Sequence, residues 1–326
     1  GRQNLNLYRF DQYLKCQKWC SGEKNMNYVV GNITEPAFRP PSEWDALLIP
    51  VTNGCTHKCT FCSMYRTKKF EIRKDIDEIK RELELAGSMY GDRIQKIFYE
   101  DGNAFTVKPE ILAEVTEHAY KVHPNLKKVS AYAHAKDIVK KSVEELKLLA
   151  DAGFTMVYVG VESGDDEVLK ACRKGTNQDE FSVAAQNCHE AGIAWSGIFL
   201  LGLAGDDPEK SRKHAIESAK LINRMAPRSP IEWYISPLTL EISPGTDLWE
   251  QEQRGEFRKG SFIQILEELY TMIEFTDDNL QNCVFNTNHA SNYMSLKGEL
   301  GRDKQEFLNT IRKGIEYVKE KHPDWI

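Results

Sequence analysis

Three cysteines stand close together in the segment VTNGCTHKCTFCSMY, at residues 51–65. Cys55, Cys59 and Cys62 have the spacing C-x3-C-x2-C, so their three thiolates can fold around one soft metal centre. A [4Fe–4S] cluster usually takes four cysteine ligands, and three would leave one iron open to a reactive ligand. The spacing therefore predicts a [4Fe–4S] cluster with an open coordination position.

Two alternatives stay open for these thiolates. One is zinc, and the other is a cluster whose fourth ligand comes from elsewhere in the chain. The side chains considered as further ligands are His57, Cys172, Cys188 and Cys283.

The elements that must position these cysteines alternate along the chain. Short apolar runs predict strands, and the amphipathic segments between them predict helices. The predicted strands are 46–51, 96–100, 128–135, 156–162, 193–203 and 231–238. The predicted helices are 72–90, 109–122, 142–153 and 208–225, with further helical segments around 166–191. Six such units predict an α/β fold, a partial (β/α)6 TIM-like barrel, with functional groups where the strands end.

The predicted domains are an N-terminal preamble (1–45), a core barrel (46–250) and a helical C-terminal extension (251–326). The extension has helical patterns at 262–275 and 303–320, and residues 276–302 between them read as irregular and polar. The stretch 286–304, which overlaps the end of this segment, is unusually polar. Because long irregular segments often act as lids, we expect this stretch to close the barrel mouth. Its predicted catalytic residues are His289 and Tyr293, with further polar groups at Ser291, Asn292 and Lys297.

Composition narrows the function classes. Of 326 residues, 43 are Lys or Arg and 49 are Asp or Glu, so the net charge is −6 and nucleic acid is an unlikely partner. No apolar run is long enough to cross a membrane, and no signal-peptide pattern is present, so we expect a cytoplasmic protein. Eight cysteines are too few for a disulfide scaffold, which favours metal binding for those that cluster.

The cysteine motif, with Phe61 before its last cysteine and a strand before its first, resembles the radical S-adenosylmethionine (radical SAM) superfamily. In that family three cysteines hold a [4Fe–4S] cluster whose unique iron chelates the amino and carboxylate groups of SAM. The reduced cluster cleaves SAM to a 5′-deoxyadenosyl radical, which abstracts hydrogen from a substrate. The resemblance implies a flavodoxin or ferredoxin as electron donor, and it places Phe61 near the adenine.

Two further segments carry the resemblance. YEDGNAF (99–105) is similar to the family segment that binds the SAM amino group, which implies roles for Asp101, Gly102 and Asn103. GVESGDDEVLKACRKG (160–175) resembles the branch that includes oxygen-independent coproporphyrinogen oxidase-like and methylthiotransferase-like enzymes. This likeness implies that Glu162 binds the ribose and that a cation, either Lys174 or Arg173, pairs with the SAM carboxylate.

GIFLLGLAGDDPEKS (197–211) resembles another segment of that branch, and implies that the adenine lies against the backbone at Gly202, Leu203 and Gly205. SPLTLEISPGTDLWE (236–250) resembles a later turn of the same branch. Independently of any resemblance, Ser130, Tyr132 and His134 alternate along one predicted strand. They would share one face and line the cleft.

The sequence thus predicts a radical SAM enzyme acting on a small-molecule, lipid-like or peptide substrate. One alternative is a non-catalytic relative that traffics iron–sulfur clusters or haem. Another is a sulfur-insertion enzyme with a second cluster at Cys16 and Cys20, which lie one helical turn apart. A zinc-binding structural protein is the third. The substrate, the fate of SAM and the oligomeric state stay open.

Overall fold

The computed structural model describes residues 28–31, 33 and 37–322. Within these residues the main sheet has eight strands, in the order β1-β4-β5-β6-β7-β8-β9-β10. Neighbours from β1 to β9 are parallel, and β10 is antiparallel to β9. The strands are β1 (Leu47–Pro50), β4 (Lys96–Glu100), β5 (Lys128–Tyr132), β6 (Met156–Glu162), β7 (Ala194–Leu201), β8 (Trp233–Thr239), β9 (Cys283–Asn286) and β10 (Lys297–Glu299).

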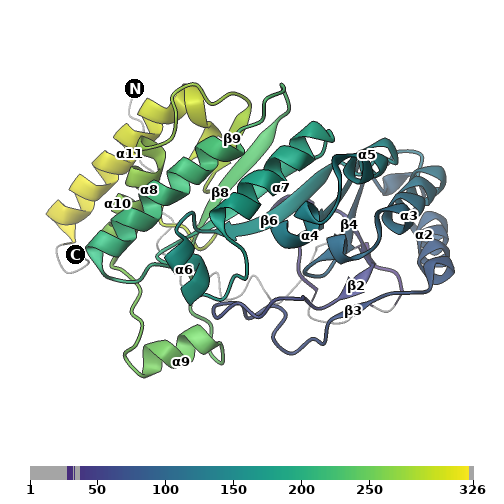
Figure 1. The fold of residues 1–326 in the computed structure, drawn as a ribbon, viewed down its shortest axis with the longest axis horizontal. Coiled ribbons are helices and arrows are strands. Elements are labelled where there is room, and N and C mark those ends of the chain that lie inside the picture. Colours follow the sequence, from purple (N-terminus) through teal and green to yellow (C-terminus); the bar gives the residue numbers. More distant parts are fainter. Residues whose placement is uncertain (1–27, 32, 34–36, 323–326) are drawn as a thin grey trace.

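Helices flank the curved sheet (Figure 1), with α2, α3 and α5 at one end and α8, α10 and α11 at the other. Alone among the labelled helices, α9 projects away from the body. The helices are α2 (Ile76–Tyr90), α3 (Pro109–Val122), α4 (Ala135–Val139), α5 (Val143–Asp151), α6 (Asp166–Ala171), α7 (Gln178–Glu190), α8 (Pro208–Met225), α9 (Asp247–Gln253), α10 (Phe262–Glu274) and α11 (Leu300–Lys321). None of the described helices is long and apolar enough to cross a membrane.

Alternation along the strands builds two apolar layers. One set of side chains, including Tyr99, Trp195 and Trp233, enters the main core together with the apolar sides of the helices. The alternate set, including Phe98 and Tyr158, forms a smaller cluster of its own. Both sheet faces are thus apolar over much of their area, which explains why the strands read as nearly continuous hydrophobic runs.

The six predicted strands and the TIM-like α/β fold class are confirmed. The prediction that residues 276–302 are irregular is wrong, because they contain β9 and β10. Within β9, Cys283 and Phe285 are buried beside Trp233 and Ile235 of β8. The short run CVFN becomes a strand because β8 supplies a parallel partner for it, a tertiary contact that its sequence does not reveal.

Two predicted boundaries also change. The strand predicted at 128–135 ends at Tyr132, because the His134 side chain accepts a hydrogen bond from Lys136 N and caps α4. The helix predicted at 72–90 begins only after Asp75, whose carboxylate accepts a hydrogen bond from Glu78 N. Residues Glu71–Ile72 before it form β3, which pairs with β2 (Thr52–Asn53).

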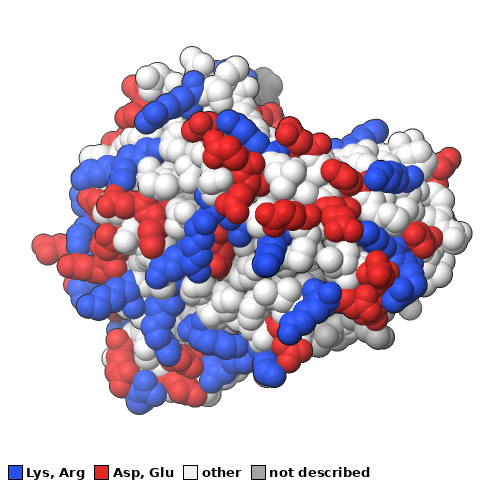
Figure 2. Space-filling model, turned by 45° about the vertical axis from the view of Figure 1, so that its right-hand side comes forward, with Lys and Arg blue, Asp and Glu red and all other residues white. Residues whose placement is uncertain are grey.

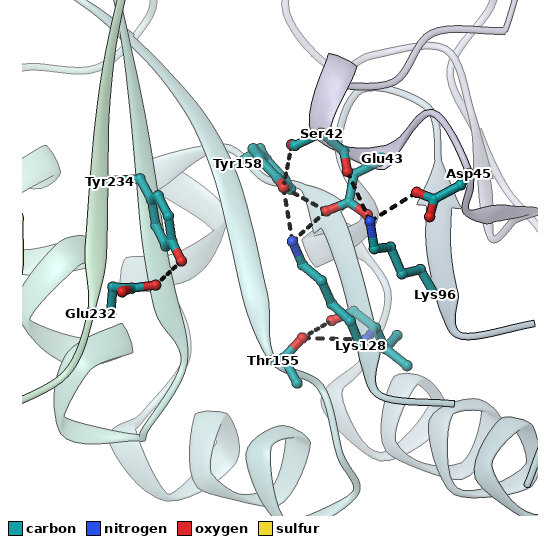
Figure 3. A network of polar contacts seen from close by, with 10 residues as sticks. Ser42, Glu43, Asp45, Lys96, Lys128, Thr155, Tyr158, Glu232 and Tyr234 are labelled. Atoms are coloured by element: carbon teal, nitrogen blue, oxygen red, sulfur yellow. Dashed lines mark hydrogen bonds and ion pairs between the residues drawn. The ribbon is translucent and has the colours of Figure 1, made fainter. Parts of the chain in front are cut away.

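A buried polar network lies where the strands begin (Figure 3). Glu43, in the short 3-10 helix Pro41–Glu43, is fully buried and accepts a hydrogen bond of 2.5 Å from Tyr158 Oη. Lys128 at the start of β5 pairs with the same carboxylate, and Ser42 also contacts Tyr158. This part of the predicted preamble therefore packs against the amino-terminal end of the barrel.

Candidate functional site

The three-cysteine loop follows β1 and β2, at the carboxyl end of the first barrel strand. Cys55, Cys59 and Cys62 are free thiols, and each is partly exposed. Cys62 N donates to Cys59 O at 3.1 Å, and His57 N donates to Cys55 Sγ at 3.5 Å. The loop thus presents three accessible sulfur ligands where functional groups collect in this fold.

The segment after β4 fixes the start of this loop. Gly54 N donates to Asp101 Oδ2 at 2.7 Å, and Lys68 Nζ pairs with Asp101 Oδ1 at 2.9 Å in a buried ion pair. Gly102 N donates to Gly54 O at 3.0 Å. A Cβ at Gly102 would lie 2.7 Å from Cys55 Cβ, so only glycine lets this segment approach the first cysteine so closely.

Two histidines clamp the middle of the loop. The rings of His57 and His134 stack with their centroids 3.4 Å apart and their planes at 8°. Burial, with the nearby charge of Lys174, lowers the pKa of His57 to about 4 and that of His134 to about 2. Both imidazoles are therefore neutral near pH 7, which removes the repulsion that two stacked cations would suffer.

Asn103 and Lys174 complete this clamp. Asn103 is buried, and its Nδ2 donates to Asp137 Oδ2 at 2.7 Å and to Thr56 Oγ1 at 3.1 Å. Asn103 Oδ1 accepts a hydrogen bond from His134 N. His134 Nε2 lies 3.2 Å from Lys174 O, so the segments after β4, β5 and β6 meet around the loop.

The two cations proposed for the SAM carboxylate have different surroundings. Lys174 Nζ pairs with Glu162 Oε1 at 2.8 Å, and both side chains are largely buried. Arg173 is exposed and pairs with Asp247, which also accepts a hydrogen bond from Arg66. Of the two cations, only Lys174 lies with Glu162 beside the cysteine loop.

Electrostatics couple this ion pair to the cysteines. Burial raises the pKa of Cys59 to about 11, although the charge of Lys174 opposes the shift. Burial by itself would lower the pKa of Lys174, but the carboxylate of Glu162 and then Cys59 raise it above its usual value. A bound cationic cluster would favour the thiolates over the thiols, so its assembly releases protons.

The donor set fits an iron–sulfur cluster. Three free, partly exposed thiols on a pinned loop match the cysteine ligation that such clusters require. Among the described residues, no three histidine, cysteine, aspartate or glutamate side chains converge closely enough for a single metal ion.

The residues predicted around the adenine also come together. Phe61 and Leu203 pack into one apolar cluster with Cys172, Leu240 and Leu248. Leu248 belongs to α9, and its N donates to Thr60 O of the cysteine loop at 2.9 Å. Thus the turn after β7 and the projecting α9 arm both reach the loop.

Gly202 lies beside Lys259, which in turn contacts the predicted lid. A Cβ at Gly202 would lie 3.3 Å from Lys259 Cγ, and Lys259 Nζ lies 5.8 Å from the ring centre of Tyr293. The Tyr293 ring stacks on Phe262 with the centroids 4.4 Å apart. His289 lies nearby in the chain, and its Nδ1 is 2.8 Å from Ser291 Oγ.

Asn292 holds this segment in place. Its Nδ2 donates to Pro237 O and Thr287 O, each at 2.8 Å, and Thr239 Oγ1 donates to its Oδ1. Because Pro237 and Thr239 are among the last residues of β8, the segment is anchored at the carboxyl end of that strand. Lys297 lies apart from this anchor, at the start of the edge strand β10.

Ser130 and Tyr132 lie on the inner face of β5, whereas His134 lies beyond the end of that strand. Ser130 is buried, and its Oγ has no hydrogen-bond partner among the described residues. Tyr132 packs against the rings of Phe98 and Tyr158. His134 is thus the member of the three that lies in the clamp of the cysteine loop.

The remaining cysteines have separate places. Cys16 and Cys20 lie outside the described residues. Cys188 and Cys283 are buried in the main core, whereas Cys172 packs beside Leu203. Cys172 O accepts a hydrogen bond from Thr60 N, so this cysteine supports the loop through its backbone.

Sequence reasoning missed several residues that shape the site. Lys68 pairs with Asp101 across 33 positions, and Leu248 reaches the cysteine loop from almost two hundred residues away along the chain. Neither has a motif of its own. The positive backbone angle of Glu162, with φ at 67°, was equally invisible in the sequence, since a non-glycine residue there gives no local signal.

A family model described as the Radical SAM superfamily matches residues 49–215, just over half of the chain. Bacteriochlorophyllide d C-12(1)-methyltransferase of Chlorobaculum tepidum is 28% identical over 169 residues, covering 50% of this chain and 35% of that protein. The tRNA-2-methylthio-N(6)-dimethylallyladenosine synthase of Bordetella avium is 24% identical over 185 residues, covering 53% of this chain and 38% of that protein. The chain thus spans little more than a third of the length of either relative.

The fold has a counterpart among solved structures. Coproporphyrinogen III oxidase from Escherichia coli superposes with a TM-score of 0.50 at 14% sequence identity, covering 71% of this chain and 51% of that one. At this identity the match concerns the fold. It agrees with the mostly parallel α/β sheet flanked by helices.

Proposed function

Because the chain belongs to the radical SAM superfamily, we propose that it is an enzyme whose Cys55, Cys59 and Cys62 bind a [4Fe–4S] cluster. When bound, this cluster supplies the electron that cleaves SAM to a 5′-deoxyadenosyl radical, which abstracts hydrogen from the substrate. The observation that carries the proposal is the cysteine loop, with three accessible thiols held in place from several strand ends. Such fixed ligands orient a reactive group without reorganisation.

The chain's task toward SAM is orientation. In this proposal Glu162 accepts hydrogen bonds from the ribose, and Lys174 rather than Arg173 offers its charge to the SAM carboxylate. The position of Lys174 in the buried pair with Glu162 supports this choice. The carboxylate of Asp101 already binds Gly54 and Lys68, so the backbone of residues 101–103 is the part that would receive the SAM amino group.

The adenine would lie on the apolar cluster that contains Phe61 and Leu203, with the backbone at Gly202 and Gly205 alongside. The substrate would then lie over the inner face of the barrel, where Ser130 and Tyr132 stand. His289 and Tyr293, anchored through Asn292 at the end of β8, are the side chains proposed to meet it and to give or take a proton.

The proposed substrate is a small molecule, a lipid-like molecule or a peptide, and a flavodoxin or ferredoxin is the proposed electron donor in the cytoplasm. On the face shown in Figure 2, Lys and Arg intermingle with Asp and Glu. This mixture and the net charge of −6 do not favour binding to the phosphates of a nucleic acid. The two relatives named above differ in chemistry, so the reaction subclass is left to experiment.

The test is made anaerobically on reconstituted protein. We expect about four irons per chain and dithionite-driven formation of 5′-deoxyadenosine from SAM. A variant with Cys55, Cys59 and Cys62 all replaced by Ala should lose both. The matched control is Cys188→Ala, which removes a thiol from the main core and should keep both.

Two other results would change the reading. Near eight irons per chain would favour a second cluster at Cys16 and Cys20, and with it the sulfur-insertion alternative. Zinc in place of iron, with no 5′-deoxyadenosine formed, would contradict the proposal.

A further inference from the structure

A buried chain of hydrogen bonds runs behind the two strand ends assigned to SAM. Ser163, directly after Glu162, has its Oγ 2.7 Å from His214 Nδ1. His214 Nε2 lies 3.4 Å from Glu268 Oε1, and the same carboxylate oxygen accepts a hydrogen bond of 2.7 Å from Gly202 N. Ser211 Oγ donates to the other oxygen of Glu268 at 2.5 Å. This network of hydrogen bonds thus joins the ends of β6 and β7.

The groups of this network can all be paired with one another. His214 Nε2 faces two acceptors, Leu200 O at 3.2 Å and the carboxylate of Glu268, so Nε2 carries the hydrogen. Ser163 Oγ accepts a hydrogen bond from Asp165 N, and its hydroxyl hydrogen can donate to Nδ1. Glu268 then accepts from Gly202 N, Ser211 and His214. Each of these polar side chains therefore has a hydrogen-bond partner inside the protein.

Helix packing does not account for this network. His214 on α8 is fully buried and Glu268 on α10 is 2% exposed. Burying an imidazole and a carboxylate costs more than apolar side chains of the same volume would cost between two helices. What the network achieves is contact with loop backbone, at Gly202 N and, through Ser163 Oγ, at Asp165 N.

The β6 end needs such support. Glu162 has φ at 67°, a conformation that disfavours a non-glycine residue and persists only where the surroundings hold it. A Cβ at Gly164 would lie 2.2 Å from Glu217 O, so this loop sits directly on the backbone of α8. Gly164 N also donates to Ser218 Oγ of α8 at 3.0 Å. The turn of α8 that carries His214 therefore adjoins the strained Glu162.

We propose that His214 and Glu268 are positioning residues that hold the β6 and β7 loops in a fixed mutual geometry for SAM. This inference rests on the proposed function, because it takes Glu162 as the ribose contact and Gly202 as part of the adenine site. His214 fixes Ser163 and so the direction of Glu162, while Glu268 fixes Gly202 N. Neither side chain touches SAM itself.

The experiment measures SAM affinity by anaerobic equilibrium dialysis on cluster-loaded protein, alongside iron per chain and melting temperature. In His214→Asn the amide oxygen can replace Nδ1 toward Ser163 but cannot reach Glu268. Glu268→Gln keeps the shape but has a single acceptor oxygen for three donors. The control is His189→Asn, since His189 is also buried and, among the described residues, its ring hydrogen-bonds the backbone at Met225 O.

We expect both test variants to bind SAM on the order of 10-fold more weakly with unchanged iron, as losses of indirect support do elsewhere. Because both residues act in one hydrogen-bond network, the double variant should lose less SAM affinity than the product of the two single-variant factors. The His189→Asn control should lower the melting temperature and leave the affinity unchanged.

An unchanged SAM affinity in both folded variants, with a lowered melting temperature only, would overturn the inference and leave a structural role. If His214→Asn does not fold, Glu268→Gln alone decides by the same measure. Failure of the unaltered protein to bind SAM despite four irons would instead overturn the proposed function, which keeps the two failures distinct.

Discussion

Gly102 shows how much a single residue decides at the cysteine loop. Its Cα hydrogen faces Cys55, and an added Cβ would lie 2.7 Å from Cys55 Cβ and 3.0 Å from its sulfur. Because Cys55 Cβ is close to the backbone, it cannot rotate away as the end of a long side chain could. The first cysteine of the loop would have to move.

Gly102→Ala is therefore expected to reduce iron incorporation on reconstitution at least several-fold, with a loss of stability of roughly 1–3 kcal/mol. Iron per chain and urea unfolding measure the two effects. The control is Gly314→Ala in α11, where the Cβ meets only the terminal methyl of Met294, a flexible side chain. Full iron content in Gly102→Ala would show that the loop tolerates displacement of Cys55.

A second residue-scale prediction concerns His189 at the end of α7. Burial lowers its pKa from 6.5 to about 4, so the unfolded chain binds its proton at a higher pH than the folded chain. The free energy of unfolding therefore falls as the pH decreases from 6.5 toward 4, and about 2 kcal/mol is lost from this residue between pH 7 and pH 5.

His189→Asn should remove that part of the pH dependence. Urea unfolding of both proteins at pH 7 and pH 5 checks it, and the comparison cancels the contributions of the other buried histidines. Equal losses in the two proteins would mean that His189 does not titrate in this range.

At the scale of elements, the α9 arm is joined to the barrel in two ways. Leu248 is buried in the apolar cluster with Leu203 and Cys172, whereas Asp247 pairs with Arg66 and Arg173 at the surface. Exposed ion pairs contribute little, because water and salt screen them and long side chains lose entropy. Burial of a leucine contributes several times more.

We expect Leu248→Ala to cost about 2–4 kcal/mol and Asp247→Asn less than about 1 kcal/mol. Limited proteolysis should cleave the arm of Leu248→Ala faster, while Asp247→Asn should resemble the unaltered protein. The reverse order would mean that the ion pairs fix the arm. Since Leu248 N binds the cysteine loop, slower SAM cleavage in Leu248→Ala is also expected.

At the scale of the whole molecule, the two ends of the barrel have different tasks. The cysteine loop, Glu162 and the α9 arm lie at the carboxyl ends of the strands, while Glu43 lies at their amino ends with Lys128 and Tyr158 (Figure 3). In barrels of this kind the first end carries chemistry and the second carries stability.

Glu43→Ala should therefore lower stability by roughly 3 kcal/mol, because it leaves Lys128 partly buried without its carboxylate. SAM affinity and iron content should stay unchanged. The matched control, Glu71→Ala, removes an acid from an exposed pair with Lys69 and should cost less than about 0.5 kcal/mol. A large loss of SAM affinity in folded Glu43→Ala would show that the two ends are coupled.

The sequence by itself determined the features that are local along the chain. The spacing of Cys55, Cys59 and Cys62 predicts a cluster site, and six apolar runs alternating with helices predict the parallel sheet. Because parallel strands end at one edge of a sheet, the motifs after each strand could be expected to meet there. The match to the family model confirms the resemblance of the cysteine motif to the radical SAM superfamily.

Only the tertiary structure decided which of two adjacent residues is buried and which residues distant along the chain come into contact. It buried Lys174 with Glu162 and left Arg173 at the surface, although the two cations are adjacent in the chain. It also made β9 a strand and joined His214 to Glu268. A local pattern records which side chains are available, whereas burial and pairing depend on segments tens of residues away, which no short window of sequence contains.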